Sequence, residues 1–414
     1  MTLTLVEHDA LEPALYSALA AVLVRARGGA LMHLPASFDT RAYADAAQHV
    51  AVAGALVASG LIWLERLTGI DVTAAAGVDA ILAGAATGNV VVPYHPAVRS
   101  REIVDAMEQR AGQSGIAVER LRVLHDRGVF ELRDAETGAP LDIAGRWTRD
   151  RFGRFSPVDR QSREGAAAEN TMPLRIGLVG TEAEHRDVYP AALASLADAA
   201  GAENVALDVV FIPPIDLREQ DVDGILGAVA GVLLPGGSDM INVPGQIKVA
   251  HGALRTRTPA VGLCLGMQSM TTAVVQKALG STQASLAEAA PDAPIKTFTM
   301  MAERGLMPYR LGEMTTVTKP GSRTAAILGA ESKIRCNHRF HFNPELIPVA
   351  AKAGLHVTAR DATGEVTDAV ELDGHPFYFG MQGHPELSSR DGAAHPLLRA
   401  FVRACAERAD QRDR

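Results

Sequence analysis

One cysteine flanked by glycines is the residue best suited to covalent chemistry in this sequence. The stretch from Gly262 to Gly266 (GLCLG) follows a short run of small and apolar residues, 258–261. The pattern predicts a strand, a sharp turn at Cys264 and then a helix. Small neighbours suit such a turn, and a helix N-terminus favours the thiolate over the thiol. Cys264 is therefore a candidate nucleophile, although a buried core cysteine fits the same pattern.

Two further motifs can complete a catalytic site. His384 and Glu386 flank Pro385 near the C-terminus, and in extended backbone two such side chains share one face. Glu386 can then hold the imidazole while its other nitrogen faces a nucleophile. Upstream, the glycine pair Gly236 and Gly237 follows a predicted strand, where backbone N–H groups can approach a ligand closely. The three motifs occur in the order that a Cys-His-Glu amidase requires.

The composition is that of a two-domain protein of enzyme size. The chain has 414 residues, which exceeds the length at which one hydrophobic core usually stops growing. Apolar residues make up 47% of it and charged residues 21%, as is ordinary for a globular protein. A net charge of −8 without a basic run argues against a nucleic-acid partner. Three cysteines cannot form a disulfide framework. With neither a signal peptide nor an apolar run of membrane-spanning length, a cytoplasmic location and no membrane partner are expected.

Pattern and composition divide the chain into two α/β domains, 1–155 and 173–414, joined by a linker at 156–172 that is poor in bulky apolar residues. In the smaller first domain, helices are expected at 11–27, 40–67, from Asp71 onward and at 100–112, and strands at 29–34, 89–94, 117–124 and 129–132. In the second domain, strands at 174–180, 208–212 and 231–234 and a helix at 189–200 precede the elbow. This alternation predicts a mostly parallel sheet flanked by helices.

Three histidines of the first domain, His33, His95 and His125, each fall at or just beyond the end of a predicted strand. Ligands of open α/β sheets bind beyond the carboxyl ends of the strands, so a shared pocket is one interpretation. Structural histidines with satisfied hydrogen bonds are the alternative. No local spacing predicts a metal site, and no cofactor is expected.

Residues 174–405 resemble the class I, triad-type glutamine amidotransferase domain of CTP synthases. The matching stretches are 176–180, 234–237, 262–268, 309–312, 337–340, 384–386 and 390–392. The resemblance implies that Cys264 is the nucleophile, His384 the base and Glu386 its orienting carboxylate. It also implies a thioester intermediate on the cysteine.

The same resemblance assigns further roles. It implies that the N–H groups of Gly237 and Leu265 stabilise the oxyanion. Gln268, Glu288 and Arg339 fall where the family contacts the substrate glutamine, with Glu288 suited to its amino group and Arg339 to its carboxylate.

Two departures limit what the resemblance implies. In CTP synthases the glycine pair continues as Gly-Gly-Phe-Gly and, shortly after, Arg-Gly, in a lid linked to glutamine binding and GTP activation. Here Ser238 to Asn242 (SDMIN) occupy these positions, which puts GTP control in doubt and leaves a substrate other than glutamine open. Residues 1–155 contain no lysine and no phosphate-binding glycine loop, so a complete CTP synthase is not expected.

Three functional interpretations follow. The leading one is a glutaminase that supplies ammonia to an acceptor site, either in residues 1–155 or on a partner protein. The second is a hydrolase or transferase acting on another γ-glutamyl or amide compound with the same residues. The third is a non-catalytic regulatory module, against which the intact set of Cys264, His384 and Glu386 argues. Whether the chain forms a homo-oligomer is left open.

Overall fold

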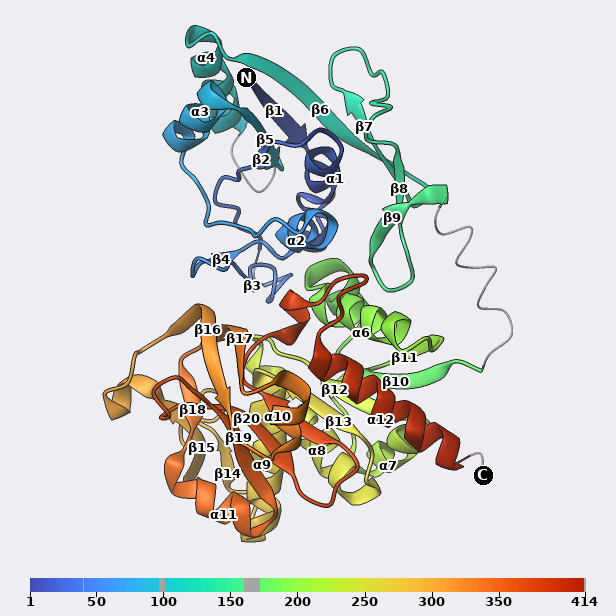
Figure 1. The fold of residues 1–414 in the computed structure, drawn as a ribbon, viewed down its shortest axis with the longest axis vertical. Coiled ribbons are helices and arrows are strands. Elements are labelled where there is room, and N and C mark those ends of the chain that lie inside the picture. The colour runs from blue at the N-terminus through green and yellow to red at the C-terminus, as the bar shows by residue number, and fades with distance from the viewer. Residues whose placement is uncertain (40, 97–100, 160–171, 413–414) are drawn as a thin grey trace. The chain divides into compact units, whose positions relative to one another are not determined.

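The computed structural model describes residues 1–39, 41–96, 101–159 and 172–412. The chain divides into two compact units (Figure 1). Unit 1 comprises Met1–Asn170 and Ala183–Ala194, and unit 2 comprises Thr171–Glu182 and Ser195–Arg414. Most of the expected linker, residues 160–171, lies outside the described residues. Within the part of the chain that the structure describes, no helix has the length and apolar character needed to cross a membrane.

Unit 1 is built on a seven-stranded mixed sheet. Its strands are β1 Thr2–Glu7, β2 Ala30–Leu31, β5 Asn89–Tyr94, β6 Ala117–Asp126, β7 Val129–Asp134, β8 Arg146–Arg149 and β9 Phe155–Pro157. The spatial order is β2-β5-β1-β6-β7-β8-β9. The first four strands are parallel, and β6 to β9 form an antiparallel meander. The strands expected at 89–94, 117–124 and 129–132 are therefore confirmed.

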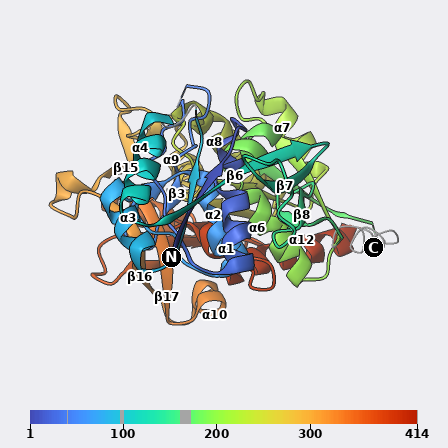
Figure 2. The ribbon, with the colours of Figure 1, turned by 90° about the horizontal axis from the view of Figure 1, so that it is seen from above.

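The helices of unit 1 are α1 Ala18–Arg27, α2 Ile62–Thr68, α3 Val78–Thr87 and α4 Arg101–Gln113. Two of them, α3 and α4, lie side by side in both views (Figures 1 and 2). Their buried side chains, such as Ile81 and Met107, join Leu3, Leu5 and Val92 of the sheet in one apolar cluster. The other two, α1 and α2, contact each other.

The helix expected at 40–67 is wrong. Apart from Thr40, which is not described, this segment forms turns, a short hairpin of β3 His49–Val50 and β4 Leu56–Val57, the 3-10 turn η2 Ser59–Leu61, and only then α2. Gly54 takes a positive φ of 86°, as a turn requires. A Cβ at Gly60 would lie 2.2 Å from the carbonyl oxygen of Tyr16, so the two backbones touch there. These tertiary contacts override the helix propensity of the alanines.

Two other expected helices begin later than the sequence suggests. The segment 11–27 is interrupted by Ser17 at φ 68°, which separates the 3-10 turn η1 Pro13–Leu15 from α1. The helix expected from Asp71 begins at Val78. Before it, the N–H of Val72 donates to Oε1 of Glu65 (3.0 Å) and the N–H of Ala76 to the carbonyl of His33 (2.8 Å). Backbone groups committed to such partners cannot form a helical turn.

Unit 2 contains a nine-stranded sheet in the order β11-β10-β12-β13-β21-β20-β19-β16-β17. The strands are β10 Leu174–Val179, β11 Leu207–Ile212, β12 Gly231–Leu234, β13 Ala260–Leu263, β16 Arg310–Thr318, β17 Glu331–His338, β19 Leu355–Asp361, β20 Thr367–Leu372 and β21 Tyr378–Met381. The strands from β11 to β21 are parallel, as the sequence predicts for this domain, and the other four extend the sheet in antiparallel pairs. A small sheet joins β14 Ala284–Leu286, β15 Ile295–Met300 and β18 Phe340–Phe342.

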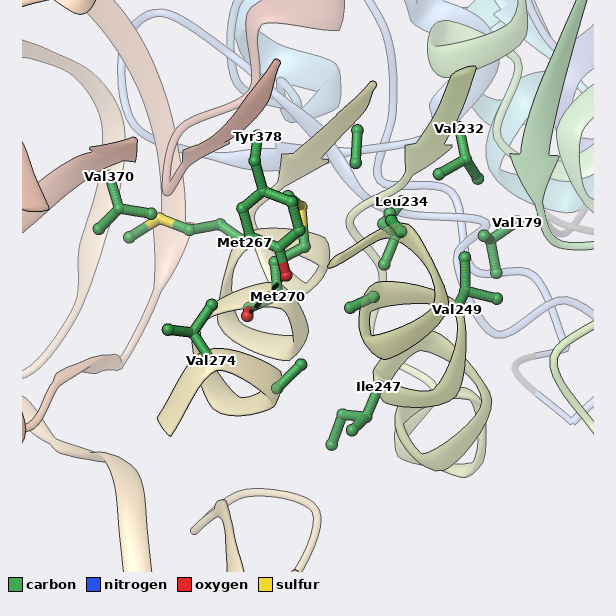
Figure 3. Packing of buried hydrophobic residues seen from close by; sticks show 14 of the residues in the cluster. Val179, Val232, Leu234, Ile247, Val249, Met267, Met270, Val274, Val370 and Tyr378 are labelled. Carbon is green, nitrogen blue, oxygen red and sulfur yellow. Dashed lines mark hydrogen bonds between the residues drawn. The ribbon is translucent and has the colours of Figure 1, made fainter. Parts of the chain in front are cut away.

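Helices pack against the nine-stranded sheet of unit 2 and against each other. They are α6 Ala191–Ala202, α7 Glu219–Gly227, α8 Val243–Thr256, α9 Leu265–Leu279 and α12 Pro396–Arg412, with the shorter α10 Arg323–Leu328 and α11 Ile347–Lys352. Figure 3 shows Met267 and Met270 of α9 packed beside Leu234 and Tyr378 of the sheet. The Tyr378 hydroxyl donates to the carbonyl of Met270 (3.0 Å). Burying each such side chain contributes roughly 1.5–3 kcal/mol, so this core fixes the start of α9 against the sheet.

Candidate active site

The turn between β13 and α9 is strained, as the glycine-flanked cysteine predicts. Cys264 has φ 48° and ψ −108°, a conformation that L residues rarely adopt. A Cβ at Gly262 would lie 2.5 Å from Sδ of Met270, and a Cβ at Gly266 would lie 2.0 Å from the carbonyl oxygen of Leu234. Both glycines are thus required for the close approach of α9 to the sheet. The arrangement holds Cys264, 6% exposed, at the N-terminus of α9.

His384 and Glu386 form a buried pair just beyond β21. Nδ1 of His384 lies 2.7 Å from Oε1 of Glu386, and the two residues are 3% and 0% exposed. The extended backbone expected here is wrong, because Pro385 opens the 3-10 turn η7 Pro385–Ser388. Proline fixes φ near the helical value and lacks only an N–H that a first turn would leave unused. The turn brings the carboxylate back to the imidazole.

Cys264 and His384 lie against the same glycine. A Cβ built on Gly236 would meet Cε1 of His384 at 3.0 Å and Cβ of Cys264 at 3.2 Å. Among the described residues, Nε2 of His384 has no hydrogen-bond partner within ordinary limits. Burial lowers the pKa of His384, but Glu386 and Cys264 raise it by more, so the net pKa lies well above its usual range. The arrangement favours the imidazolium form of His384.

The two backbone N–H groups predicted to stabilise the oxyanion belong to Gly237 and Leu265, which lie close to Cys264 in the chain or in the fold. Gly237, which follows β12, has φ 152°. Leu265 is the first residue of α9, where N–H groups have no acceptor inside the helix. Because a Cβ on Gly266 would strike the end of β12, the start of α9 and the glycine pair after β12 belong to one compact region.

The residues expected to contact a substrate divide into a buried and an exposed group. Gln268 is 3% exposed, and its Oε1 has no hydrogen-bond partner among the described residues. Glu288 and Arg339 are exposed. Desolvation by neighbouring atoms raises the pKa of the Glu288 carboxyl, whereas the charge of Arg339 lowers it, so the two side chains interact electrostatically. The guanidinium of Arg339 lies 4.0 Å from the ring centroid of Tyr309.

Sequence reasoning assigned no role to two residues that contact the sulfur of Cys264, or to a tyrosine bonded to one of them. Nε2 of Gln382 lies 3.6 Å from Sγ, and the carbonyl oxygen of Asn337 lies 3.9 Å from it. The Tyr309 hydroxyl donates to Oδ1 of Asn337 (2.6 Å). All three belong to stretches next to or within the motifs that carry the resemblance, which is the signal that singles them out.

A buried ion pair supports the strands that carry these residues. Arg310 of β16 donates to Oδ1 of Asp368 in β20 at 2.5 Å, and both side chains are at least 95% buried. His338 of β17 lies beside them, with Nε2 at 3.3 Å from the Arg310 guanidinium. Burial and the Arg310 charge lower the pKa of His338 to about 3, so this imidazole is neutral at physiological pH. Tyr309 directly precedes Arg310, and Asn337 directly precedes His338, so both residues adjoin this buried group.

The three histidines of unit 1 do not gather in one pocket. His33 and His95 are each 3% exposed, but His125 is exposed and stacks on Phe130 with centroids 4.1 Å apart. The ring nitrogens of His33 lie 3.3 Å and 3.0 Å from the carbonyl oxygens of Leu34 and Thr73, as expected of a structural histidine. Within the described ranges, no group of three or more His, Cys, Asp or Glu side chains could hold a metal ion.

The parallel sheet flanked by helices, with Cys264 at a strand–helix elbow, defines an α/β protein with a candidate cysteine nucleophile. The family model for glutamine amidotransferase class-I matches residues 185–404, which is more than half of the chain. The chain therefore belongs to the class I glutamine amidotransferase family.

Known relatives include CTP synthases. The chain is 30% identical over 262 residues to that of Herpetosiphon aurantiacus, covering 61% of this chain and 49% of the relative. It is 32% identical over 244 residues to that of Dehalococcoides mccartyi, covering 57% and 44%. It thus spans about half the length of these relatives. The glutaminase domain of Trypanosoma brucei CTPS, solved with bound acivicin, shares the fold, with a TM-score of 0.53 and 24% identity over 56% of this chain and 94% of that one.

Selective alkylation should distinguish Cys264 from the other two cysteines. Cys336 and Cys405 are fully buried; burial raises the pKa of Cys336 to about 12 and that of Cys405 well above its usual range. Only ~10⁻⁵ of a thiol with such a pKa is ionised at pH 7. We expect a glutamine-mimicking electrophile to label Cys264 alone in the folded protein, as measured by peptide mapping. Equal labelling of all three cysteines would remove the basis for assigning the nucleophile.

Proposed function

We propose that this protein hydrolyses glutamine through Cys264, His384 and Glu386 and supplies the ammonia to an acceptor. The observation that carries the proposal is the strained cysteine beside a buried imidazole that is already paired with a carboxylate. Membership of the glutamine amidotransferase family makes a carboxamide the expected substrate.

The first half of the reaction forms a thioester. The thiolate of Cys264 attacks the side-chain carbonyl carbon of glutamine, and the C=O electron pair moves to oxygen. The N–H groups of Gly237 and Leu265 stabilise that oxyanion; one such donor is typically worth about 10²–10³ in rate. When the carbonyl re-forms, the C–N bond breaks, and the His384 imidazolium gives its proton to the leaving nitrogen, which departs as ammonia.

The second half returns the enzyme to its starting state. Neutral His384 accepts a proton from water through Nε2 while the water oxygen attacks the thioester carbonyl. Collapse of the second tetrahedral intermediate breaks the C–S bond and releases glutamate, leaving the thiolate beside an imidazolium. In both halves of the reaction Glu386 accepts a hydrogen bond from Nδ1 of His384, so that Nε2 is the nitrogen that gives and accepts the proton.

Two charged side chains suit the remaining groups of a glutamine molecule. Arg339 can bind the α-carboxylate and Glu288 the α-ammonium, while Gln268 contributes a buried amide nearer the reacting end. The charge of Arg339 lowers the pKa of the Glu288 carboxyl, which desolvation raises, and so favours the carboxylate that would bind an ammonium group.

Ammonia needs an acceptor close at hand, because in neutral water it becomes ammonium and loses its nucleophilicity. The acceptor reaction belongs either to residues 1–155 or to a partner protein. In unit 1, β1 connects through α1 to β2 on one side and β5 through α4 to β6 on the other. A ligand of such a sheet binds beyond the strand ends where the connections diverge, here at His8 and His95. These residues are the first place to look for the acceptor.

A direct assay tests the proposal. The full chain is incubated with glutamine, and glutamate and ammonia are quantified against time beside a Cys264→Ala variant. We expect equal amounts of both products from the native chain and neither from the variant. Product formation that persists without Cys264 would overturn the assignment. A parallel incubation with UTP and ATP is expected to give no CTP, because residues 1–155 have no lysine for a phosphate-binding loop.

One observation favours a second candidate, a hydrolase or transferase acting on another γ-glutamyl or amide compound. The segment that replaces the lid glycines forms a 3-10 turn, η4 Met240–Asn242, capped by the Asp239 side chain. Its Ile241 is 58% exposed. An apolar side chain here would favour a substrate with an apolar substituent. A panel of γ-glutamyl amides in the same assay separates the two candidates by the ratio of kcat/KM values.

A further inference from the structure

The side-chain amide nitrogen of Gln382 contacts the sulfur of the candidate nucleophile. Gln382 follows β21, two residues before His384, and is fully buried. Its Nε2 donates to Sγ of Cys264 at 3.6 Å, and its Oε1 accepts from Nε2 of Gln268 at 3.4 Å. The three side chains form a continuous path from the substrate-facing amide of Gln268 to the sulfur.

The backbone fixes the Gln382 side chain in place. The N–H of Gln382 donates to the carbonyl of Asp368 (2.8 Å), in the strand held by the Arg310–Asp368 ion pair. On the other side, the N–H of Cys264 donates to the carbonyl of Met381 (2.8 Å). Cys264 and Gln382 therefore directly follow the adjacent strands β13 and β21, whose register is set. The backbone positions from which the amide and the sulfur meet are fixed.

The orientation of the amide has a physical cause. Turning it over would place Oε1, a hydrogen-bond acceptor, against a sulfur that carries negative charge during the reaction. It would also place two N–H groups of Gln382 and Gln268 against each other. Only the observed orientation gives the sulfur a donor and gives Gln268 an acceptor.

The contacts of Cys264 act in opposite directions on its charge. The carbonyl oxygen of Asn337, 3.9 Å from Sγ, can accept only from the protonated thiol. The N–H of Gln382 stabilises the thiolate, since a hydrogen bond to the charged form favours that form. Loss of the Gln382 amide should therefore shift the balance toward the thiol.

We propose that Gln382 is a further catalytic residue, which donates a hydrogen bond to the Cys264 thiolate and links the sulfur to Gln268. The assignment rests on the proposed glutaminase function for its role in turnover, but the contact with the sulfur can be tested without substrate. The unpartnered Oε1 of Gln268 is left for a donor of the bound substrate.

Other titratable groups also face the sulfur. His384, Tyr309 and Cys336 interact electrostatically with Cys264, and burial raises the pKa values of Tyr309 and Cys336. None of these groups is changed by a substitution at Gln382. A shift in the ionisation of Cys264 on losing the amide is therefore assigned to the amide.

The test measures the alkylation rate of Cys264 by iodoacetamide against pH, with the labelled peptide mapped. In Gln382→Met, which keeps the length and burial of the side chain, we expect the alkylation midpoint to rise by about one pH unit. The rate below both midpoints should fall about tenfold, since a hydrogen bond to a charged group is typically worth that much. Gln382→Glu should move the midpoint further, because a carboxylate repels the thiolate.

Gln276→Met is the matched control. Gln276 is a buried amide of α9 with two good hydrogen bonds, to His251 and to the carbonyl of Ala284, and it makes no contact with the sulfur. We expect it to leave the midpoint where it is. An unchanged midpoint in both Gln382 variants, or an equal shift in the control, would overturn the proposal.

A glutaminase assay of the same proteins separates this inference from the proposed function. A shifted midpoint in a chain that does not hydrolyse glutamine refutes the function and keeps the contact. Normal hydrolysis of glutamine by the native chain, together with an unshifted midpoint in the Gln382 variants, supports the function and refutes the role of Gln382. With Gln382→Met, kcat is expected to fall about tenfold with thermal stability retained.

Discussion

Replacing Glu386 with glutamine is expected to lower kcat for glutamine hydrolysis by about 10⁴-fold, as the loss of an orienting carboxylate does in a catalytic triad. Oε1 of Glu386 accepts from Nδ1 of His384 at 2.7 Å in a fully buried site. The amide of glutamine can present an N–H there instead, which would stabilise the tautomer with its proton on Nε2. That imidazole could not accept a proton from water.

The pH dependence of this variant has a defined sign. The Glu386 charge raises the pKa of His384, so its removal lets burial lower that pKa. Any remaining activity that needs the imidazolium should therefore be lost at a lower pH than in the native chain. A pH profile of kcat, measured by ammonia release, checks this.

Glu371→Gln controls for the loss of a buried carboxylate. Glu371 is 6% exposed and accepts from the hydroxyl of Thr324 (2.9 Å), but it lies outside the proposed site. We expect it to reduce thermal stability and leave kcat within about threefold of the native value, as for residues that do not touch the reacting groups. Less than a tenfold loss in Glu386→Gln would mean that the carboxylate does not orient the base.

The elbow of unit 2 could be predicted because its signals are local. Apolar runs that end in glycine, such as 174–180 and 231–237, are typical of buried parallel strands. The glycines around Cys264 report a backbone constraint that any side chain would violate, and the structure has that constraint. The pairing of His384 with Glu386 was expected for an extended chain, yet a 3-10 turn makes it, because two residues apart is close enough in either conformation.

Unit 1 was harder to predict because its segment 40–67 is held by distant contacts. The indole N–H of Trp63 donates to the carbonyl of Ala14 (2.7 Å), and Gly60 packs against the backbone of Tyr16. Helix propensities of a few tenths of a kcal/mol per residue cannot compete with such contacts. The pattern of alanines alone therefore predicted a helix that is absent.

The surroundings of the sulfur also lay beyond sequence reasoning. Gln382 and Asn337 come from two separate strand ends, and their contacts with Cys264 depend on the register of the sheet, as does the bond from Tyr309 to Asn337. The sequence gives no measure of that register. What it does offer is their position next to recognised motifs, which marks them as candidates without defining a role.

Replacing Gly236 with alanine is expected to lower kcat by about 10²-fold, the effect of a misplacement near 1 Å in an active site. The new methyl group would stand 3.0 Å from Cε1 of His384 and 3.2 Å from Cβ of Cys264, too close for ordinary contact. One of the two must move, and both are confined, the imidazole by Glu386 and the cysteine by its strained turn. Gly236 does not adopt a positive φ, so alanine fits its backbone and the fold should survive.

Gly224→Ala provides the matched comparison, because a Cβ at this helical position of α7 would meet no atom within 4 Å. We expect it to keep native kcat and to gain slightly in stability, by up to about 1 kcal/mol. For Gly236→Ala, thermal unfolding should stay near that of the native chain, while glutamate release and iodoacetamide labelling of Cys264 both slow. If labelling slows but hydrolysis does not, the space between Cys264 and His384 is not where the chemistry occurs, and the proposed pairing of nucleophile and base fails.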